Sequence, residues 1–273
     1  GWPLLIMLLG THLYLTAILR FPQRYLLKAL KLYFVKDHTD KGDISPFSSL
    51  MVALAANIGA GNIIGVGVAI AAGGPGAVFW CWLTGVLGMA TRYSEGLLAI
   101  KYRVENKDGN MSGGPMVVLE RGLNSKWLGT AFAVFTAIAA FGIGNLTQGN
   151  AAAEQLHHAF SIPSWGTAAV LTALTALVML GGIQGIARVC AFFVPFMAVI
   201  YIMGCLYILT VQAEYIIPAI RYILDCAFTG EAAAGGAAGA AVMAAMRTGV
   251  ARGLFSNEAG LGSAAIASAA AQN

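Results

Sequence analysis

The chain has 273 residues, of which 58% are hydrophobic and only 10% are charged, and its formal net charge is +4. Soluble domains carry roughly 25% charged residues, so this composition excludes an ordinary soluble protein. Several apolar runs reach about 20 residues, enough for a helix to cross a bilayer, and the sequence therefore predicts an all-α polytopic membrane protein.

Eight membrane spans are predicted in chain order. They cover residues 2–19, 48–73, 77–100, 127–157, 165–183, 190–211, 218–250 and 254–272. Lysine and arginine gather in the connections that follow the first, third, fifth and seventh of these spans. Because basic connections stay in the cytoplasm, we expect a multi-pass protein of the plasma membrane with its N-terminus outside. The chain begins without Met and stops in an apolar stretch, so we expect it to be a portion of a longer protein.

The second predicted span is interrupted at Asn57-Ile58-Gly59-Ala60-Gly61-Asn62. Lipid cannot bond the backbone groups that a broken helix leaves free, so such a break must face protein, water or a solute. The packing alternative is that glycines such as Gly61 and Gly65 let two helices approach closely. Packing leaves the two asparagines unexplained, because a carboxamide is costly to bury without partners. Asn57 and Asn62 are therefore candidates to bind a cation or a solute.

The seventh predicted span begins at Pro218 and is interrupted by the glycines and alanines of Gly230–Gly236. Its alternative interpretation is a flexible linker. In a broken helix, the free N–H groups of the second half suit a carboxylate, and the free carbonyls of the first half suit Na⁺ or an ammonium group. Two broken spans in one chain are typical of a transporter's binding site.

The fourth predicted span carries polar residues at helical spacing, including Asn145, Gln148 and Glu154. It is longer than the hydrocarbon core, so we expect a kink at Gly142 or Gly144. We expect its polar stripe to face a central cavity; the alternative is hydrogen bonding between helices. The sequence holds no HExxH, P-loop or Ser/His/Asp pattern, so we expect neither an enzyme nor a resident metal or cofactor.

Several long stretches resemble the alanine or glycine:cation symporter (AGCS) family, which includes the sodium:alanine symporters. The similar stretches are Gly42–Phe47 (GDISPF), Asn57–Gly76 with Phe79-Trp80, Tyr93–Arg103 (YSEGLLAIKYR), Gly113–Met116, Gly181–Ile183 and Arg252–Ser268 (RGLFSNEAGLGSAAIAS). They are spread along almost the whole chain.

The resemblance implies a LeuT-like (APC superfamily) fold of two inverted five-helix repeats, truncated here after about eight transmembrane helices. Residues 1–273 would form one partial transporter domain. An extra helix would cover 1–19, the first repeat 48–211, and an incomplete second repeat 218–273. The implied function is import of alanine or glycine with Na⁺, or in some members H⁺, by alternating access. A LeuT-fold carrier of another small amine or nucleobase, and a cation channel, stay open as alternatives.

On this interpretation, the substrate-binding residues are Gly59, Gly61, Asn62, Gln148, Gly149, Asn150, Gly235 and Gly236. The cation-binding candidates are Asn57, Ala60, Thr229 and Asn257. The expected partners are alanine or glycine, Na⁺ as the coupling ion, and membrane lipid, with no nucleic acid. The sequence leaves the oligomeric state open, a monomer being compatible with it.

Overall fold

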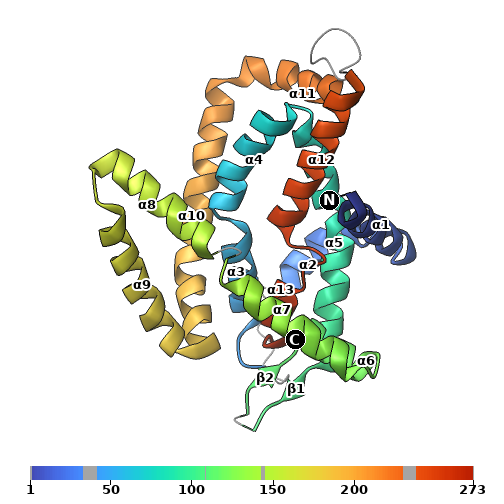
Figure 1. Cartoon of the computed structure of the whole chain (residues 1–273), viewed down its shortest axis with the longest axis vertical. Coiled ribbons are helices and arrows are strands. Elements are labelled where there is room, and N and C mark those ends of the chain that lie inside the picture. Colours follow the sequence, from blue (N-terminus) through green and yellow to red (C-terminus); the bar gives the residue numbers. More distant parts are fainter. Residues whose placement is uncertain (1, 33–41, 108, 143–144, 230–237, 273) are drawn as a thin grey trace. The chain divides into compact units, whose positions relative to one another are not determined.

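A computed structural model describes residues 2–32, 42–107, 109–142, 145–229 and 238–272. These residues are nearly all helical (Figure 1). The helices are α1 (Trp2–Ile18), η1 (Pro22–Tyr25), α2 (Leu26–Leu32), α3 (Pro46–Asn57), α4 (Ala60–Gly73), α5 (Ala77–Tyr102), α6 (Pro115–Gly122), α7 (Lys126–Ala140), α8 (Asn145–Phe160), α9 (Ser164–Leu180), α10 (Gly182–Val211), α11 (Ala213–Phe228), α12 (Ala238–Asn257) and α13 (Ser263–Ala269). The strands β1 (Val104–Glu105) and β2 (Met111–Ser112) form an antiparallel hairpin.

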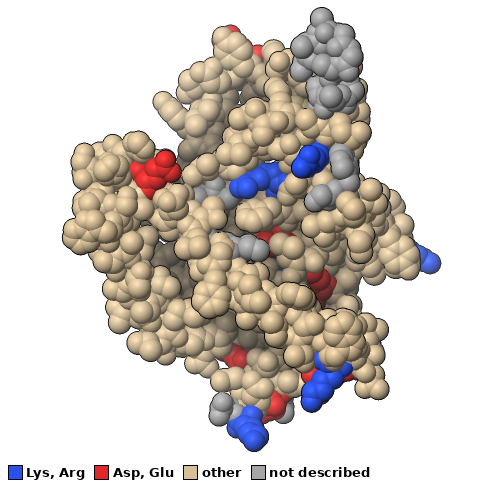
Figure 2. All heavy atoms as spheres, in the orientation of Figure 1, with Lys and Arg blue, Asp and Glu red and all other residues tan. Residues whose placement is uncertain are grey.

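The surface of the chain is apolar, as a lipid-facing surface requires. Figure 2 shows charged side chains as separate patches on a face that is otherwise uncharged. Among the described residues, Pro46–Gly73, Lys126–Phe160 and Gly182–Val211 are long and apolar enough to cross a membrane. A fourth crossing is possible if Pro3–Ile18 and Pro22–Leu32, bent by 64°, form one span. A membrane protein with several spans is therefore supported.

Two of the predicted interruptions are confirmed. Between α3 and α4, Ile58 has φ −91° and ψ 81°, outside the helical region. The fourth predicted span is divided into α7 and α8, and Gly142 lies in the interruption, while Gly144 lies outside the described residues. The long apolar segments are thus continuous in hydropathy but not in backbone geometry.

The seventh predicted span differs from the structure at its start. Helix α11 begins at Ala213, and Pro218 lies inside it rather than in its first turn. The earlier start is favoured by Glu214, because an acidic side chain in the first turn stabilises the positive end of a helix. The predicted break at Gly230–Gly236 lies outside the described residues, so it stays a prediction.

The eighth predicted span, residues 254–272, is wrong. Helix α12 continues to Asn257, and α13 has only seven residues. Between them, Glu258, Gly260 and Gly262 have φ values of 52°, 90° and 76°. These left-handed conformations cannot continue a helix and suit glycine. The predicted single span is therefore interrupted at Glu258–Gly262.

The chain divides into two compact units. Unit 1 consists of residues up to Leu26, Asn62–Ser94 and Phe196–Leu261, and unit 2 consists of Leu27–Gly61, Glu95–Pro195 and the residues from Gly262 onward. The chain passes from one unit to the other at residues 26/27, 61/62, 94/95, 195/196 and 261/262. The boundary at 61/62 lies in the first turn of α4, and the boundary at 261/262 lies in the interruption between α12 and α13.

In unit 1, α12 packs closely against α5 through two glycines of α12. A Cβ at Gly249 would lie 2.7 Å from Cβ of Trp80, and one at Gly253 would lie 3.0 Å from Cβ of Thr84. Further along, Nδ2 of Asn257 donates to the carbonyl of Thr84 at 3.2 Å. Residue numbers rise together on both helices, so α5 and α12 run in parallel. Gly249 and Gly253 form a GxxxG pattern, the usual means of close helix contact in membranes.

Helix α4 packs on the same α12 in the opposite direction (Figure 1). A Cβ at Gly73 would lie 2.8 Å from Cβ of Thr248, while Gly65, two turns earlier on α4, contacts Arg252 further along α12. The two helices are therefore antiparallel. Packing at Gly65 is thus confirmed, whereas a Cβ added to Gly67, two residues further on, would have no described atom within 4 Å.

In unit 2, hydrogen bonds to backbone groups hold the last described residues in place. The N–H of Asp43 donates to the carbonyl of Ala270 at 2.8 Å, and the Asp43 carboxylate accepts from the N–H of Met111 at 2.8 Å. Arg103 Nη1 donates to the carbonyl of Ala271 at 2.6 Å. Because a charged donor or acceptor strengthens a hydrogen bond, these contacts hold the β1–β2 hairpin, which the sequence analysis did not predict, beside residues 269–272.

Candidate functional site

The interruption between α3 and α4 has a buried, unsatisfied acceptor on its first side. Asn57 ends α3, and its Nδ2 donates to the carbonyl of Ala53 at 2.8 Å. Its Oδ1 is buried and has no hydrogen-bond partner among the described residues. A buried acceptor without a partner costs about 1–3 kcal/mol. The Asn57 oxygen can therefore offer a cation or a polar solute a site that no described protein group fills.

Gly59, within the same interruption, lies against α8 in unit 2. A Cβ at Gly59 would meet the Gln148 carboxamide, 3.1 Å from both Cδ and Oε1. Gly59 and Gln148 thus lie side by side, although Gln148 is exposed rather than enclosed. Of its two neighbours on α8, Gly149 is half-buried and a Cβ added there would have no described atom within 4 Å, and Asn150 is exposed.

The second side of the interruption belongs to unit 1. Asn62 lies in the first turn of α4, and its Oδ1 is also buried without a hydrogen-bond partner among the described residues. Ala60 and Gly61 begin the helix, and their surroundings fall outside the described side chains. Asn57 and Asn62 therefore each have a side-chain oxygen without a described partner. Close helix packing through glycine does not explain why asparagine stands at these two positions.

Asn257 ends α12 and is engaged in local bonds. Its Oδ1 accepts from the N–H of Ala259 at 2.9 Å, and its Nδ2 bonds to α5 in unit 1. The carboxamide thus stabilises the turn in which the backbone leaves α12 and links it to α5. In unit 2, Oε1 of Glu95 accepts from the N–H of Gly262 at 3.1 Å, just before α13. The role of Asn257 as a cation ligand stays a prediction.

The interruption at Glu258–Gly262 was not predicted, although the sequence contains a pattern that indicates it. Asn257, Gly260 and Gly262 repeat the order of Asn57, Gly59 and Gly61, an asparagine followed by two glycines two positions apart. Both segments end a helix at the asparagine and resume it within a few residues. The repeated pattern would have located the second interruption more precisely than apolar length did.

The remaining predicted residues lie near the end of α11. Thr229 follows the helix, and its Oγ1 donates to the carbonyl of Asp225 at 2.6 Å. Phe228, just before it, packs in unit 1 against Phe79 and Trp80, with ring centroids 4.9 and 5.9 Å away. The predicted Gly235 and Gly236 lie outside the described residues. The role of Thr229 as a cation ligand stays a prediction.

Taken unit by unit, the described residues offer buried amide oxygens and interrupted backbone rather than catalytic side chains. Amide and backbone oxygens suit hard cations such as Na⁺, and free backbone N–H groups suit carboxylates. Binding a small zwitterion and a cation is the chemistry that this set of groups can perform.

The similarity of this chain to known proteins agrees with the binding of a small zwitterion and a cation. Residues 1–273 match the family described as the sodium:alanine symporter family. The chain is 53% identical over 274 residues to an uncharacterized transporter of Haemophilus influenzae, covering 100% of this chain and 60% of that protein. It is 51% identical over 276 residues to the sodium/alanine symporter AgcS of Methanococcus maripaludis, covering 98% and 60% respectively. It is 36% identical over 270 residues to the probable sodium/glutamine symporter GlnT of Bacillus subtilis, covering 98% and 55%. The chain thus spans about 60% of the length of its more similar relatives.

Proposed function

Because the chain belongs to the sodium:alanine symporter family, we propose that the native protein imports alanine or glycine together with Na⁺ by alternating access. The family is one of sodium-coupled carriers and not of enzymes. The observation that carries the proposal is the interruption at Ile58-Gly59, flanked by Asn57 and Asn62, whose oxygens are buried without described partners. A carrier needs such groups for its cargo, whereas a folded core does not tolerate them without cost.

We propose that the substrate binds at this interruption. Gly59, Gly61 and Asn62 would present backbone groups to it, and α8 would line its side through the three residues 148–150. Asn57 would contribute an oxygen to the Na⁺ site, with Ala60, Thr229 and Asn257 as further candidates. Gly235 and Gly236 stay in the proposed substrate set on sequence grounds alone.

The proposed fold is LeuT-like, with α3–α4 as the first helix of repeat one. We assign the first helix of repeat two to α12–α13, interrupted at Glu258–Gly262, rather than to α11–α12. The presence of α12 in this helix is supported by its antiparallel packing with α4 in unit 1, because the first helices of inverted repeats cross the membrane in opposite senses. The choice of α13 as its second half is supported by the interruption at Glu258–Gly262, which corresponds to the one at Ile58-Gly59. The division of the chain into an extra N-terminal helix and two repeats otherwise follows the sequence boundaries.

The proposed location is the plasma membrane, with the N-terminus outside. It is supported by the basic connections. The parallel packing of α5 with α12 is consistent with it, since the third and seventh predicted spans should cross the membrane in the same direction.

Uptake into proteoliposomes tests the function. The purified native protein is reconstituted, and labelled alanine is followed with an inward Na⁺ gradient, with an inward H⁺ gradient, or with neither. Saturable accumulation that requires Na⁺ supports the proposal, and accumulation driven by H⁺ alone would replace the coupling ion. Unlabelled glycine and glutamine as competitors define the substrate, since one relative is named for glutamine. Non-saturable Na⁺ flux without amino acid would instead indicate a channel.

A further inference from the structure

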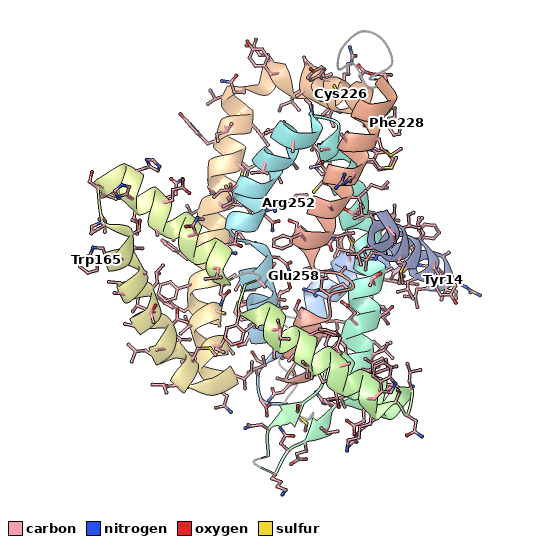
Figure 3. The ribbon with its side chains drawn as sticks, in the orientation of Figure 1. Tyr14, Trp165, Cys226, Phe228, Arg252 and Glu258 are labelled. Carbon is pink, nitrogen blue, oxygen red and sulfur yellow. The ribbon has the colours of Figure 1, made fainter. Side chains whose placement is uncertain are left out.

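Three segments that are distant in the sequence meet in unit 2 beside the start of α3. They are residues 42–44, which precede α3, residues 103–112, which follow α5 and include the hairpin, and residues 269–272, at the end of α13. The chain reaches α13 through the second interruption, which begins at Glu258 (Figure 3). The start of one interrupted helix is thus joined to the end of the other.

Backbone hydrogen bonds join the segment before α3 to the segment after α13. Ile44 and Ala271 are partners in a parallel β-bridge. The N–H of Ile44 donates to the carbonyl of Ala270 at 3.1 Å, and the carbonyl of Ile44 accepts from the N–H of Gln272 at 2.8 Å. The Gln272 side chain also donates, from Nε2 to the carbonyl of Gly42 at 3.1 Å. The two segments therefore lie edge to edge, as neighbouring strands do.

Two charged side chains add the third segment. Nη1 of Arg103 donates to the carbonyls of Ala271 at 2.6 Å and Ala269 at 3.3 Å. The Asp43 carboxylate accepts from the N–H of Met111 in the hairpin at 2.8 Å. The last carbonyls of a helix have no partner within that helix. At the end of α13 they are satisfied by groups from the other two segments.

Hydrogen bonds, more than apolar packing, hold the three segments together. Most of the buried apolar side chains around them are small, and small side chains bury little apolar surface. These residues are Ile44, Ala99, Ala187, Ala265, Ala269 and Ala270. When hydrogen-bonded segments separate at an aqueous surface, water bonds to the freed groups, so the net cost of each lost bond is small. The contact can therefore open and close without unfolding its helices.

The predicted topology puts this contact on the cytoplasmic side. Residues 42–44 lie in the connection after the first predicted span, and Arg103 lies in the connection after the third, both of which are rich in basic residues. In alternating access the site opens to each side of the membrane in turn. A contact between the cytoplasmic ends of the two interrupted helices must then part when the substrate leaves.

We propose that residues 42–44, 103–112 and 269–272 form a cytoplasmic latch, which is closed while the substrate enters from outside and opens to release it. Arg103 is a positioning residue of this latch, because it acts through the carbonyls at the end of α13 rather than on the substrate. This inference rests on the proposed function and adds to it the contacts that distinguish the two states of the carrier.

Arg103→Gln tests the latch through the balance between these states. Initial rates of alanine uptake are measured in right-side-out and inside-out membrane vesicles that contain the full-length protein, with equal Na⁺ on both sides. Loss of hydrogen bonds from a charged donor shifts an equilibrium by about 10- to 100-fold. The apparent affinity on each side follows the fraction of carriers open to that side. We therefore expect the ratio of the cytoplasmic to the external half-saturating alanine concentration to fall by that factor.

The ratio separates a latch from a merely structural contact. A variant that is only less stable has fewer active carriers, which lowers both rates and leaves the ratio unchanged. The matched control is Lys101→Gln, which removes a cation from the same end of α5. The Lys101 ammonium lies over the Tyr102 ring, 5.5 Å from its centre, and the ratio should not change.

A cross-link tests the latch without removing Arg103, and it decides if Arg103→Gln fails to fold. Ile44→Cys and Ala271→Cys are combined in a cysteine-free, full-length protein. Paired strands lie about 4.8 Å apart, a separation that a disulfide spans. Oxidation should abolish alanine uptake but preserve Na⁺-dependent alanine binding, and a reductant should restore uptake.

An unchanged ratio in a folded Arg103→Gln protein, or uptake at the parent rate by a fully cross-linked protein, overturns the latch and leaves the proposed function in place. A parent protein that does not accumulate alanine in a Na⁺ gradient overturns the proposed function, and the latch with it.

Discussion

The contact between α12 and α5 allows the loss of stability in Gly249→Ala to be predicted. A Cβ there would lie 2.7 Å from Cβ of Trp80 and 2.9 Å from the carbonyl carbon of Ala77. Since one of these atoms is backbone, the clash cannot be relieved by a rotamer change, and the helices must separate. Overpacking of this kind costs about 1–3 kcal/mol.

The matched control is Gly85→Ala on α5, where no described atom lies within 4 Å of the new methyl group. Both substitutions replace glycine by alanine inside a helix and gain similar intrinsic helix propensity, so their difference isolates the contact. At about 2–4 °C per kcal/mol for a chain of this size, Gly249→Ala should melt roughly 2–12 °C below Gly85→Ala.

Thermal unfolding of the native protein in detergent, followed by intrinsic fluorescence at a fixed scan rate, measures this difference. If the two variants melt within about 1 °C of each other, α12 and α5 do not pack through Gly249, and the parallel arrangement inferred for unit 1 is refuted.

Three further predictions concern the proposed site and its orientation. Gln148→Ala should raise the apparent KM for alanine uptake several-fold, because the carboxamide lies against Gly59, whereas Gly204→Ala on α10, where no described atom lies within 4 Å of the added methyl group, should not; equal effects would remove Gln148 from the site. Asn57→Leu should raise the Na⁺ concentration needed for half-maximal uptake about tenfold or more, because it removes an oxygen acceptor; an unchanged Na⁺ dependence contradicts this role. In a cysteine-free background, an impermeant maleimide added to intact cells should label a cysteine at Gln212 but not one at Asn110, since only the former connection is predicted to lie outside; the reverse pattern would invert the topology.

Hydropathy located most helices because membrane crossing depends on apolar length, which is a property of the linear sequence. Helices α5 and α9 were predicted to within a few residues of their bounds in this way. The interruption at Ile58-Gly59 was also predictable, since two asparagines and two glycines stand out in an apolar run. Hydropathy failed at residues 254–272, where an apolar average concealed three left-handed residues that end α12.

By itself, the sequence determined the class of the protein, its family, its charge asymmetry and the first interrupted helix, because composition and local pattern carry that information. Only the tertiary structure decided which glycines serve helix contact. Gly249 and Gly253 meet α5 and Gly65 admits Arg252, whereas Gly67 meets no described atom. A glycine has the same local propensity at each of these positions. Its role depends on the atoms that another helix brings within reach, which pattern along one chain does not specify.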